Sequence, residues 1–532
     1  MLSLPTVRRL LLLTVVCAVT PMTLRAEDKP LRQVIDGEMR ALWEREKITP
    51  VGKASDAVFM RRVYLDVVGT LPTPEEAAKF LKDDDAKKRE KLIDTLLADP
   101  RFATAQASVW DVVLFGRNPA GGDATRKRDA FKKWLGGKFA DNESCDHWVR
   151  DLLLAEQEGS EMFYVQFRSA PEDAAVAVSR IFLGTQLQCA RCHDHPFKSW
   201  KQREFFGMAG FFVRLVVVDK SEKKFAIGEK SSGDVLFTGA VKDQKPGQKG
   251  EPVKPKFLGG QELDEPPLPK DFKEPVIDAK SQPKPLFSRK EKFADWLVSS
   301  ENPYFAKAVT NRVWAQFIGR GLVHPIDDLG DKGDSTPAGL LDAATKEFVA
   351  HKLDLKWYIR ELCNSETYQL ADDGPLKESL PEHFERSRVR PLSAEELIAS
   401  LRQATGYDAS GAKPGPLPGA GDEYILRYFG EPTNGLGDFQ GSLAEHLFLN
   451  NSDVIHALIQ RRKGNLADTI LTSTDSWEER VDRMFLAVLS RLPKPEEQKR
   501  FVTHMKSDPK PDALVEEAIW VLLNTAEFRF NH

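Results

Sequence analysis

Apolar residues recur at helical spacing through most of this 532-residue chain, and this periodicity restricts its fold more than any other feature. Because a helix has 3.6 residues per turn, side chains three or four positions apart lie on one face and can be buried together. Such stripes occur within residues 31–42, 92–97 and 305–317. The pattern predicts a mainly α fold in which these faces form the core.

Two short segments mark helix starts. In Thr73-Pro74-Glu75-Glu76, the threonine can cap, the proline fits the first turn, and Glu76 can complete a capping box. Ser288 can cap a second helix that runs through Phe293 and Leu297. Both segments are therefore predicted to begin helices.

The chain also contains a weak internal repeat. Residues 62–80 are echoed by residues 483–501 at a constant offset of 421, and 96–102 resemble 522–528 at an offset of 426. We interpret the repeat as a duplicated helical unit because apolar positions match on both sides of the turn. Convergent capping chemistry is the alternative, since Pro-Glu-Glu begins many helices.

The helical pattern stops in the middle of the chain. Three short β-prone runs lie at residues 215–218, 225–227 and 235–237, followed by a stretch rich in Lys, Pro, Gly and Gln at 241–285. The expected architecture is two helical domains separated by a small β-containing insert and a linker. The predicted segments are a signal peptide (1–26), a first helical domain (27–214), the insert and linker (215–287) and a second helical domain (288–532).

The first 26 residues have the features of a secretory signal. Arg8 and Arg9 form a basic start, residues 10–19 are apolar, and Ala26 ends a plausible cleavage region. An uncleaved anchor is the alternative, although the apolar run is short for a bilayer span. The chain is expected to be exported to the periplasm or cell surface, with no integral membrane segment once the signal is removed.

The formal net charge of −4 becomes more negative when the arginines of the signal are removed. Nucleic acid and anionic membranes are therefore not expected to be the main partners.

Four cysteines lie beyond the signal. Cys145 and Cys363 are far apart and could form a disulfide, remain as two buried thiols, or do neither. Cys189 and Cys192 differ because His193 follows them directly. Two thiols at this spacing can bond to the two vinyl groups of one porphyrin, with the next histidine on the iron. Cys189, Cys192 and His193 are therefore predicted to bind haem c, with His193 as the proximal ligand.

Other residues near the motif suit a haem pocket. Met208 is the nearest downstream candidate for the sixth iron ligand and Met162 the nearest upstream one, although each is more often a core residue. His195 is too close to His193 to reach the opposite face of the porphyrin. Flat apolar surface is expected from Phe182, Phe197, Trp200, Phe205, Phe206, Phe211 and Phe212, which could also be ordinary core.

Two other readings of the motif stay open. A structural zinc could be held by Cys189, Cys192 and either His193 or His195, although a closed site needs a fourth ligand. Cys145 with His147 is the one obvious second cluster. A Cys189–Cys192 disulfide is the third possibility, but the strand-then-helix context of thioredoxin-like motifs is absent.

No catalytic residue is assigned, and enzymatic activity is left open. Asp327 and Asp328 are adjacent acids, which point apart; they are expected to fix a turn or to pair with Arg312 or Arg320. The sequence contains no nucleophile elbow, phosphate-binding glycine loop or metalloprotease helix.

A family resemblance is carried by segments 61–66, 71–74, 96–102, 182–184, 189–197, 311–314, 319–323, 325–328, 354–356, 368–370, 390–397 and 524–528. In these segments the chain resembles the planctomycete two-domain proteins DUF1549 and DUF1553, whose domains are called planctomycete cytochrome c-like domain two and planctomycete surface domain. The resemblance implies the fold, export and haem binding, but no established reaction. Between Phe429 and Asn450 the family usually has a cysteine-containing stretch; this chain has none, so no metal or redox role is expected there.

Three classes of function follow. The first is an exported c-type haem protein that exchanges electrons with an unknown redox partner. The second is an oxidoreductase that acts on an extracellular, polysaccharide-derived substrate. The third is a noncatalytic surface or scaffold protein with a structural zinc at the Cys-x-x-Cys-His motif.

Overall fold

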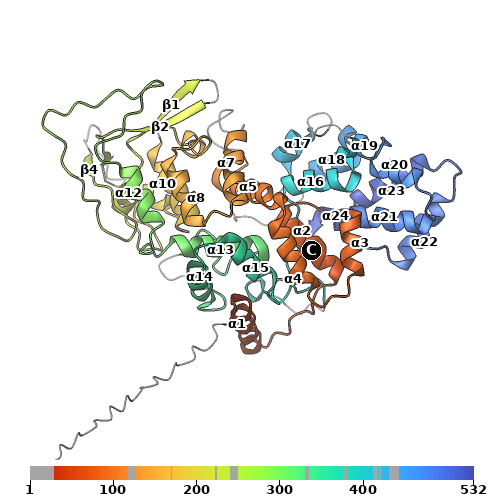
Figure 1. Ribbon diagram of the computed structural model, residues 1–532. Coiled ribbons are helices and arrows are strands. Elements are labelled where there is room, and N and C mark those ends of the chain that lie inside the picture. Colours follow the sequence, from red (N-terminus) through yellow and green to blue (C-terminus); the bar gives the residue numbers. More distant parts are fainter. Residues whose placement is uncertain are drawn as a thin grey trace, which may run out of the picture.

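The computed structural model confirms a mainly α protein with a few short antiparallel strand pairs (Figure 1). It describes residues 29–117, 128–168, 170–221, 224–239, 250–329, 335–374, 380–410, 417, 421–429 and 443–532. The predicted signal (1–26) and part of the predicted linker (241–249) lie outside these ranges. Among the described residues, no helix combines the length and apolar character needed to cross a bilayer.

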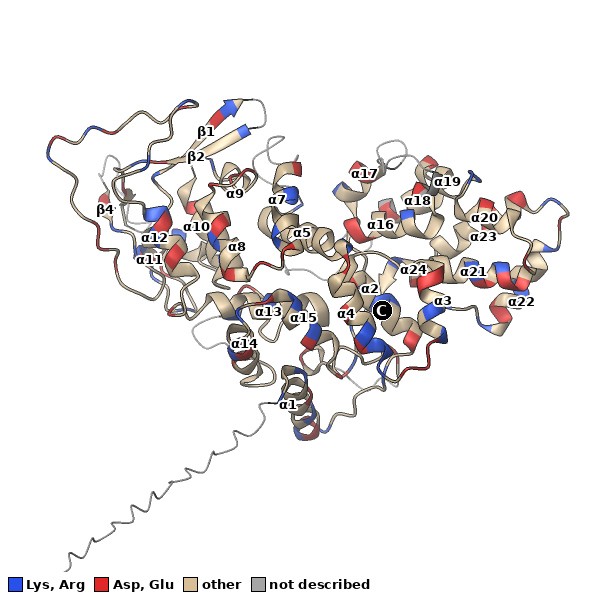
Figure 2. Cartoon of the chain, in the orientation of Figure 1, with Lys and Arg blue, Asp and Glu red and all other residues tan. Residues whose placement is uncertain are grey.

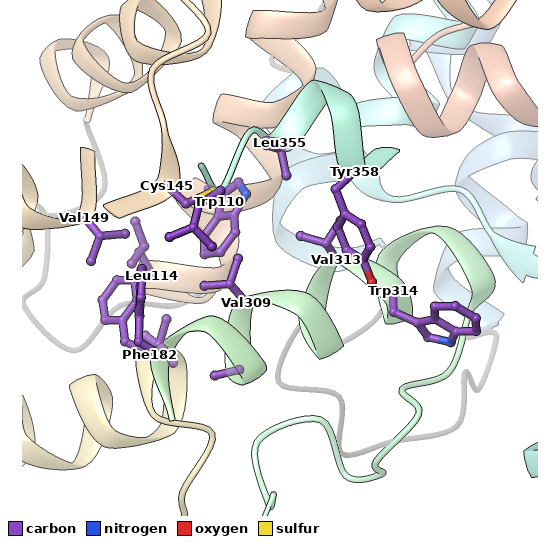
Figure 3. Packing of buried hydrophobic residues seen from close by; sticks show 14 of the residues in the cluster. Trp110, Leu114, Cys145, Val149, Phe182, Val309, Val313, Trp314, Leu355 and Tyr358 are labelled. Atoms are coloured by element: carbon purple, nitrogen blue, oxygen red, sulfur yellow. The ribbon is translucent and has the colours of Figure 1, made fainter. Parts of the chain in front are cut away.

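The larger hydrophobic core unites both predicted helical domains. Trp110 and Phe182 from the first half of the chain and Val309 and Tyr358 from the second belong to one buried cluster (Figure 3). Its helices in the first half are α1 (Leu31–Glu46), α2 (Asp56–Val68), α3 (Pro74–Lys82), α4 (Lys88–Ala98), α5 (Pro100–Phe115), α7 (Asp129–Ala140), α8 (Cys145–Leu154), α9 (Met162–Val165), α10 (Pro171–Phe182) and α11 (Gln202–Ala209). Those in the second half are α12 (Arg289–Leu297), α13 (Phe305–Ile318), α14 (Leu340–Ala350) and α15 (Leu355–Cys363).

A second core forms from the rest of the chain. The domain boundaries proposed from the sequence stay a prediction. Its buried residues run from Leu392 to Phe528, together with Leu65 and Leu71 of the first half. The helices are α16 (Ala394–Thr405), α17 (Gly421–Tyr428), α18 (Leu443–Asn451), α19 (Asp453–Ile459), α20 (Leu466–Thr472), α21 (Trp477–Leu489), α22 (Pro495–Met505), α23 (Asp512–Leu523) and α24 (Ala526–Arg529), with the short 3-10 helix η4 (Tyr407–Ser410). Another 3-10 helix, η3 (Pro381–His383), precedes this core, and its His383 carbonyl accepts from Trp43 of the larger core.

The β-prone runs of the insert form strands as predicted. β1 (Leu215–Ser221) pairs antiparallel with β2 (Lys224–Glu229), so that Val217 lies opposite Ile227. β3 (Val235–Phe237) pairs with β4 (Glu251–Val253), which the sequence did not predict because Pro252 interrupts the β pattern. A third pair joins β5 (Arg390–Pro391) to β6 (Phe530–Asn531) and ties the start of the second core to its end.

The two repeat units fold into the same succession of helices. α2, α3, α4 and α5 follow one another in the first unit, as α21, α22, α23 and α24 do in the last. Thr73 completes the predicted capping box, with its hydroxyl 3.1 Å from the Glu76 N–H. Each unit also contributes a leucine to the other core, since Leu65 is buried in the second core and Leu486 in the first.

Candidate functional site

The Cys-x-x-Cys-His motif lies in a loop between α10 and α11. Gly184 adopts a φ of +57°, and a Cβ at this position would come within 2.7 Å of the Leu329 side chain, so the turn favours glycine. Leu183 and Leu187 are fully buried and fix the start of the loop. The motif then begins in the 3-10 turn η1 (Gln188–Arg191).

Hydrogen bonds within the loop hold the residues after the second cysteine. The His195 N–H donates to the Trp200 carbonyl at 2.9 Å. The ring Nδ1 of His195 accepts from the N–H groups of Phe197 and Lys198 at 3.2 and 3.1 Å. His195 is therefore a structural residue of the loop, as expected, and its Nδ1 is already used.

Asp194 and Gln202 connect the motif to α11. The Gln202 N–H donates to the Asp194 carboxylate at 2.9 Å, and its side-chain amide donates to the Arg191 carbonyl at 3.0 Å. The Gln202 N–H and the Lys201 ammonium lower the pKa of Asp194 below its usual value. The carboxylate therefore stays ionised while it anchors the start of α11.

Residues in the second half of the chain hold the motif loop in place. The Leu329 N–H donates to the Gly184 carbonyl at 2.8 Å. The Gln186 amide donates to Asp327 at 2.8 Å, and Lys198 pairs with Asp328 at 3.1 Å. The N–H of Asp328 also closes a turn on the Pro325 carbonyl. The acidic pair thus fixes a turn as predicted, but its partners come from the motif loop.

The sequence did not predict these partners of Asp327 and Asp328. Asp327 and Asp328 were expected to pair with Arg312 or Arg320, and the structure instead gives Gln186 and Lys198 as their partners. Nothing near Lys198 in the sequence identifies a carboxylate 130 positions further along. The signal that could have found the pair is the placement of both segments in the family resemblance.

The three predicted haem-binding residues all lie at the surface. Cys189, Cys192 and His193 are exposed, and both thiols are free. The His193 Nδ1 lies 2.7 Å from the Asp194 carbonyl, so Nδ1–H donates there and Nε2 carries the available lone pair. This tautomer leaves Nε2 ready to bind a metal.

The aromatic residues expected to enclose a haem form part of the core. Phe211 stacks on Phe257 with ring centroids 4.9 Å apart and also contacts Phe293. Phe182, Trp200, Phe205 and Phe212 are likewise buried. Phe206 is half-buried against Phe205, and Phe197 is 90% exposed. Most of these rings therefore form part of the core, the alternative that the sequence left open, and a haem pocket built from them stays a prediction.

The candidate sixth ligands are buried as well. Met208 is fully buried on α11, and Met162 is buried on α9. A thioether in the core must leave its packing before it can bind an iron held at the surface. A metal-binding role for Met208 stays a prediction.

The other two cysteines are buried thiols. Cys145 on α8 and Cys363 at the end of α15 are free, which decides between the three states left open by the sequence. Burial raises the pKa of Cys145 to about 12 and that of Cys363 well above its usual value. Both thiols therefore remain protonated at neutral pH. Among the described residues, no group of three or more His, Cys, Asp or Glu side chains could hold a metal ion.

Two family models match the chain on either side of the insert. The PSCyt2 model, described as a protein of unknown function (DUF1549), matches residues 34–216, and the PSD1 model, described as a protein of unknown function (DUF1553), matches residues 289–416. This chain belongs to the two-domain DUF1549/DUF1553 proteins. The motif of this DUF1549/DUF1553 protein lies inside the DUF1549 match, and its support at Asp327 and Asp328 lies inside the DUF1553 match. No curated protein and no solved structure matches the chain.

Proposed function

We propose that this DUF1549/DUF1553 protein is exported to the periplasm or cell surface, carries one covalent c-type haem on Cys189, Cys192 and His193, and exchanges electrons with a redox partner. The observation that carries the proposal is the pair of exposed, free thiols at the 3-10 turn, followed by an exposed imidazole. Covalent attachment needs thiols that an incoming haem can reach, and exposed thiols meet this requirement.

The separation of the donors favours haem over zinc. A structural zinc needs four ligands that converge on one ion. No such group exists among the residues that the structure describes, and Cys145 is buried in α8. In c-type attachment the donors need not converge, because the thiols bond to the porphyrin edge and only the imidazole binds iron. The arrangement of Cys189, Cys192 and His193 therefore fits a haem better.

The surroundings of the motif favour electron exchange over substrate chemistry. A bound haem would supply a one-electron redox centre. Most of the aromatic side chains near the motif in sequence are packed in the core, whereas the ring of Phe197 is exposed. Because Cys189, Cys192 and His193 are exposed too, the cofactor edge would face solvent and a docking partner. The bonds from Gly184, Gln186 and Lys198 to the second half of the chain would keep the turn in place.

The test is a haem-stained denaturing gel of the full chain, produced with its own signal in a host that attaches haem c. We expect a stained band and a mass increase of one haem. Cys189→Ser with Cys192→Ser should abolish both. His193→Ala should keep the covalent haem but change the absorption spectrum of the reduced protein, because the iron loses its proximal ligand.

Two variants outside the loop serve as matched controls. Cys363→Ala removes a buried thiol, and His147→Ala removes an exposed imidazole. Both should keep the stained band and the spectrum of the unaltered protein. A secreted polypeptide with the mass of its amino acids alone, or one zinc per chain in elemental analysis, would contradict the proposal.

A further inference from the structure

A large cavity lies where the two hydrophobic cores meet. Its volume is about 1370 Å³, and its walls come from α2, α5 and α13 of the larger core and from α16 of the second. Figure 1 shows α16 facing α2 and α5. The cavity shares no lining residue with the Cys189 to His195 loop. Ligand sites commonly occupy such junctions and measure about 300–1,000 Å³, so this cavity has room for a molecule of several rings.

The lining of the cavity carries an excess of positive charge. Seven arginines and four carboxylates line it, a formal charge of +3 in a protein whose net charge is −4. Elsewhere, acidic and basic residues are interspersed over the helices (Figure 2). The cavity therefore concentrates positive charge on an acidic protein, and such a concave surface attracts anions.

The carboxylates of the lining are already paired. Arg390 binds both Asp66 and Glu396 at 2.7 Å. Glu395 is bound by Arg117, and Asp408 by Arg402. Three arginines thus form ion pairs with all four acids. The other arginines of the lining are Arg101, Arg312, Arg320 and Arg388, of which Arg101 pairs with Glu76 and Asp99 outside the lining.

Two of these remaining arginines have unused donors. Arg320 is half-buried two residues after the end of α13 and has no ion pair or hydrogen bond to the residues that the structure describes. Arg312 donates through one terminal nitrogen to the carbonyls of Arg180 and Ile181, while its Nε–H is buried with no acceptor among the described residues. Burial lowers the pKa of Arg312 to about 10, so the guanidinium remains charged at neutral pH.

We propose that this cavity binds an organic molecule that carries two or more oxyanion groups, with Arg320 as a principal contact. The planar guanidinium of arginine matches carboxylate, sulfate and phosphate groups through paired hydrogen bonds. Aliphatic side chains, among them Val109, Val113 and Ile326, also line the cavity and can contact the carbon skeleton of the ligand. The volume and the spread of the charges exclude a single inorganic ion as the fitting ligand.

Calorimetric titration of the full chain tests the proposal with two pairs of probes. Sucrose octasulfate and trigalacturonate carry sulfates or carboxylates, and sucrose and maltotriose are their uncharged counterparts. We expect at least one anion to bind one per chain, more weakly as salt is added. Neither uncharged sugar should bind. The anion that binds more tightly identifies sulfate or carboxylate as the preferred group.

Substitutions locate the binding. Arg320→Gln should weaken binding about tenfold or more, because one charged hydrogen-bonding group is lost. Arg320→Glu should weaken it further. Arg500→Gln is the matched control, since Arg500 is exposed on α22, has no ion pair to the described residues and lies outside the cavity lining.

Three outcomes would overturn the proposal: no anion binds, the uncharged sugars bind equally well, or Arg500→Gln weakens binding as much as Arg320→Gln. Each variant is first compared with the unaltered chain in thermal unfolding. The Arg320→Gln result is read only from a variant with an unchanged midpoint; if that variant is destabilised, the probe pairs on the unaltered chain still decide. Haem staining is independent of these titrations, so either proposal can fail alone.

Discussion

The first and last helical units have the same order of helices but differ in the polar residues at equivalent positions. Thr73 caps α3 with its side chain, whereas its equivalent Lys494 provides only its backbone N–H, which donates to Glu497 at 2.7 Å. The apolar face and the acidic first turn are thus shared by both units. The side chain that completes the cap is present in only one of them.

A larger difference concerns a pair of equivalent arginines. Arg62 is buried and donates to the carbonyls of Tyr368, Leu370 and His532 at 2.6, 2.9 and 3.2 Å. Its equivalent Arg483 is partly exposed and pairs with Glu75 of the first unit. The same residue in the same helical frame therefore joins distant segments in one unit and forms a surface ion pair in the other.

The largest expected effect distinguishes these two arginines. Arg62→Ala leaves three carbonyls without a charged donor, so we expect the free energy of unfolding to fall by about 3 kcal/mol or more. Arg483→Ala removes an exposed ion pair, which contributes within about 1 kcal/mol. Urea denaturation followed by tryptophan fluorescence measures both.

Arg62→Lys sharpens this comparison, because it keeps the charge but cannot reach several carbonyls at once. Its stability should lie between those of Arg62→Ala and the unaltered protein. Equal losses in the free energy of unfolding for Arg62→Ala and Arg483→Ala would contradict this prediction. The two positions would then be equivalent in energy as well as in sequence.

A smaller effect is expected at the two helix starts. Thr73→Ala removes the hydroxyl that accepts from the Glu76 N–H, and should lower stability by about 1 kcal/mol. Lys494→Ala should change little, since no side-chain cap is lost there. Lys494→Thr should raise stability by about 0.5–1 kcal/mol because it completes the capping box. Thermal and urea unfolding measure the stability of the three variants. No gain for Lys494→Thr would contradict the predicted difference between the two caps.

The parts of the fold that the sequence predicted depend on neighbouring residues. The capping box at Thr73 and Glu76 lies within four positions, and the cap at Ser288 accepts from the Glu291 N–H three residues further on. The β-prone run at 215–218 likewise has its strand partner in the next hairpin arm. Local chemistry decides these elements, so no knowledge of the tertiary structure was needed.

The rest depends on segments that meet only in the folded chain. Phe211 was a plausible haem contact in sequence, yet it is covered by Phe257 and Phe293, which follow it by 46 and 82 positions. Lys198 and Asp328 pair across 130 positions. The helical arginines of the cavity come from α5, α13 and α16, which belong to both cores. A pattern of residue types cannot indicate which partner will cover a side chain, since periodicity records only the face that is buried.

The smallest expected effect concerns His532, which contacts Arg62 of the first unit. Burial and the nearby charge of Arg61 lower the pKa of His532, so the folded protein holds this proton less tightly than the unfolded chain does. Its contribution to stability is therefore full above the unfolded pKa of about 6.5 and is lost as the pH falls through the lower folded value. Urea denaturation at pH 7.5 and 5.5 should show a smaller loss of stability at low pH for His532→Gln than for the unaltered chain.

His504→Gln is the control, because His504 is more exposed and pairs with Glu517 at the surface. If His532→Gln and the unaltered chain lose stability equally on acidification, the surroundings of His532 do not lower the pKa of its imidazole, and the predicted contribution of His532 is wrong.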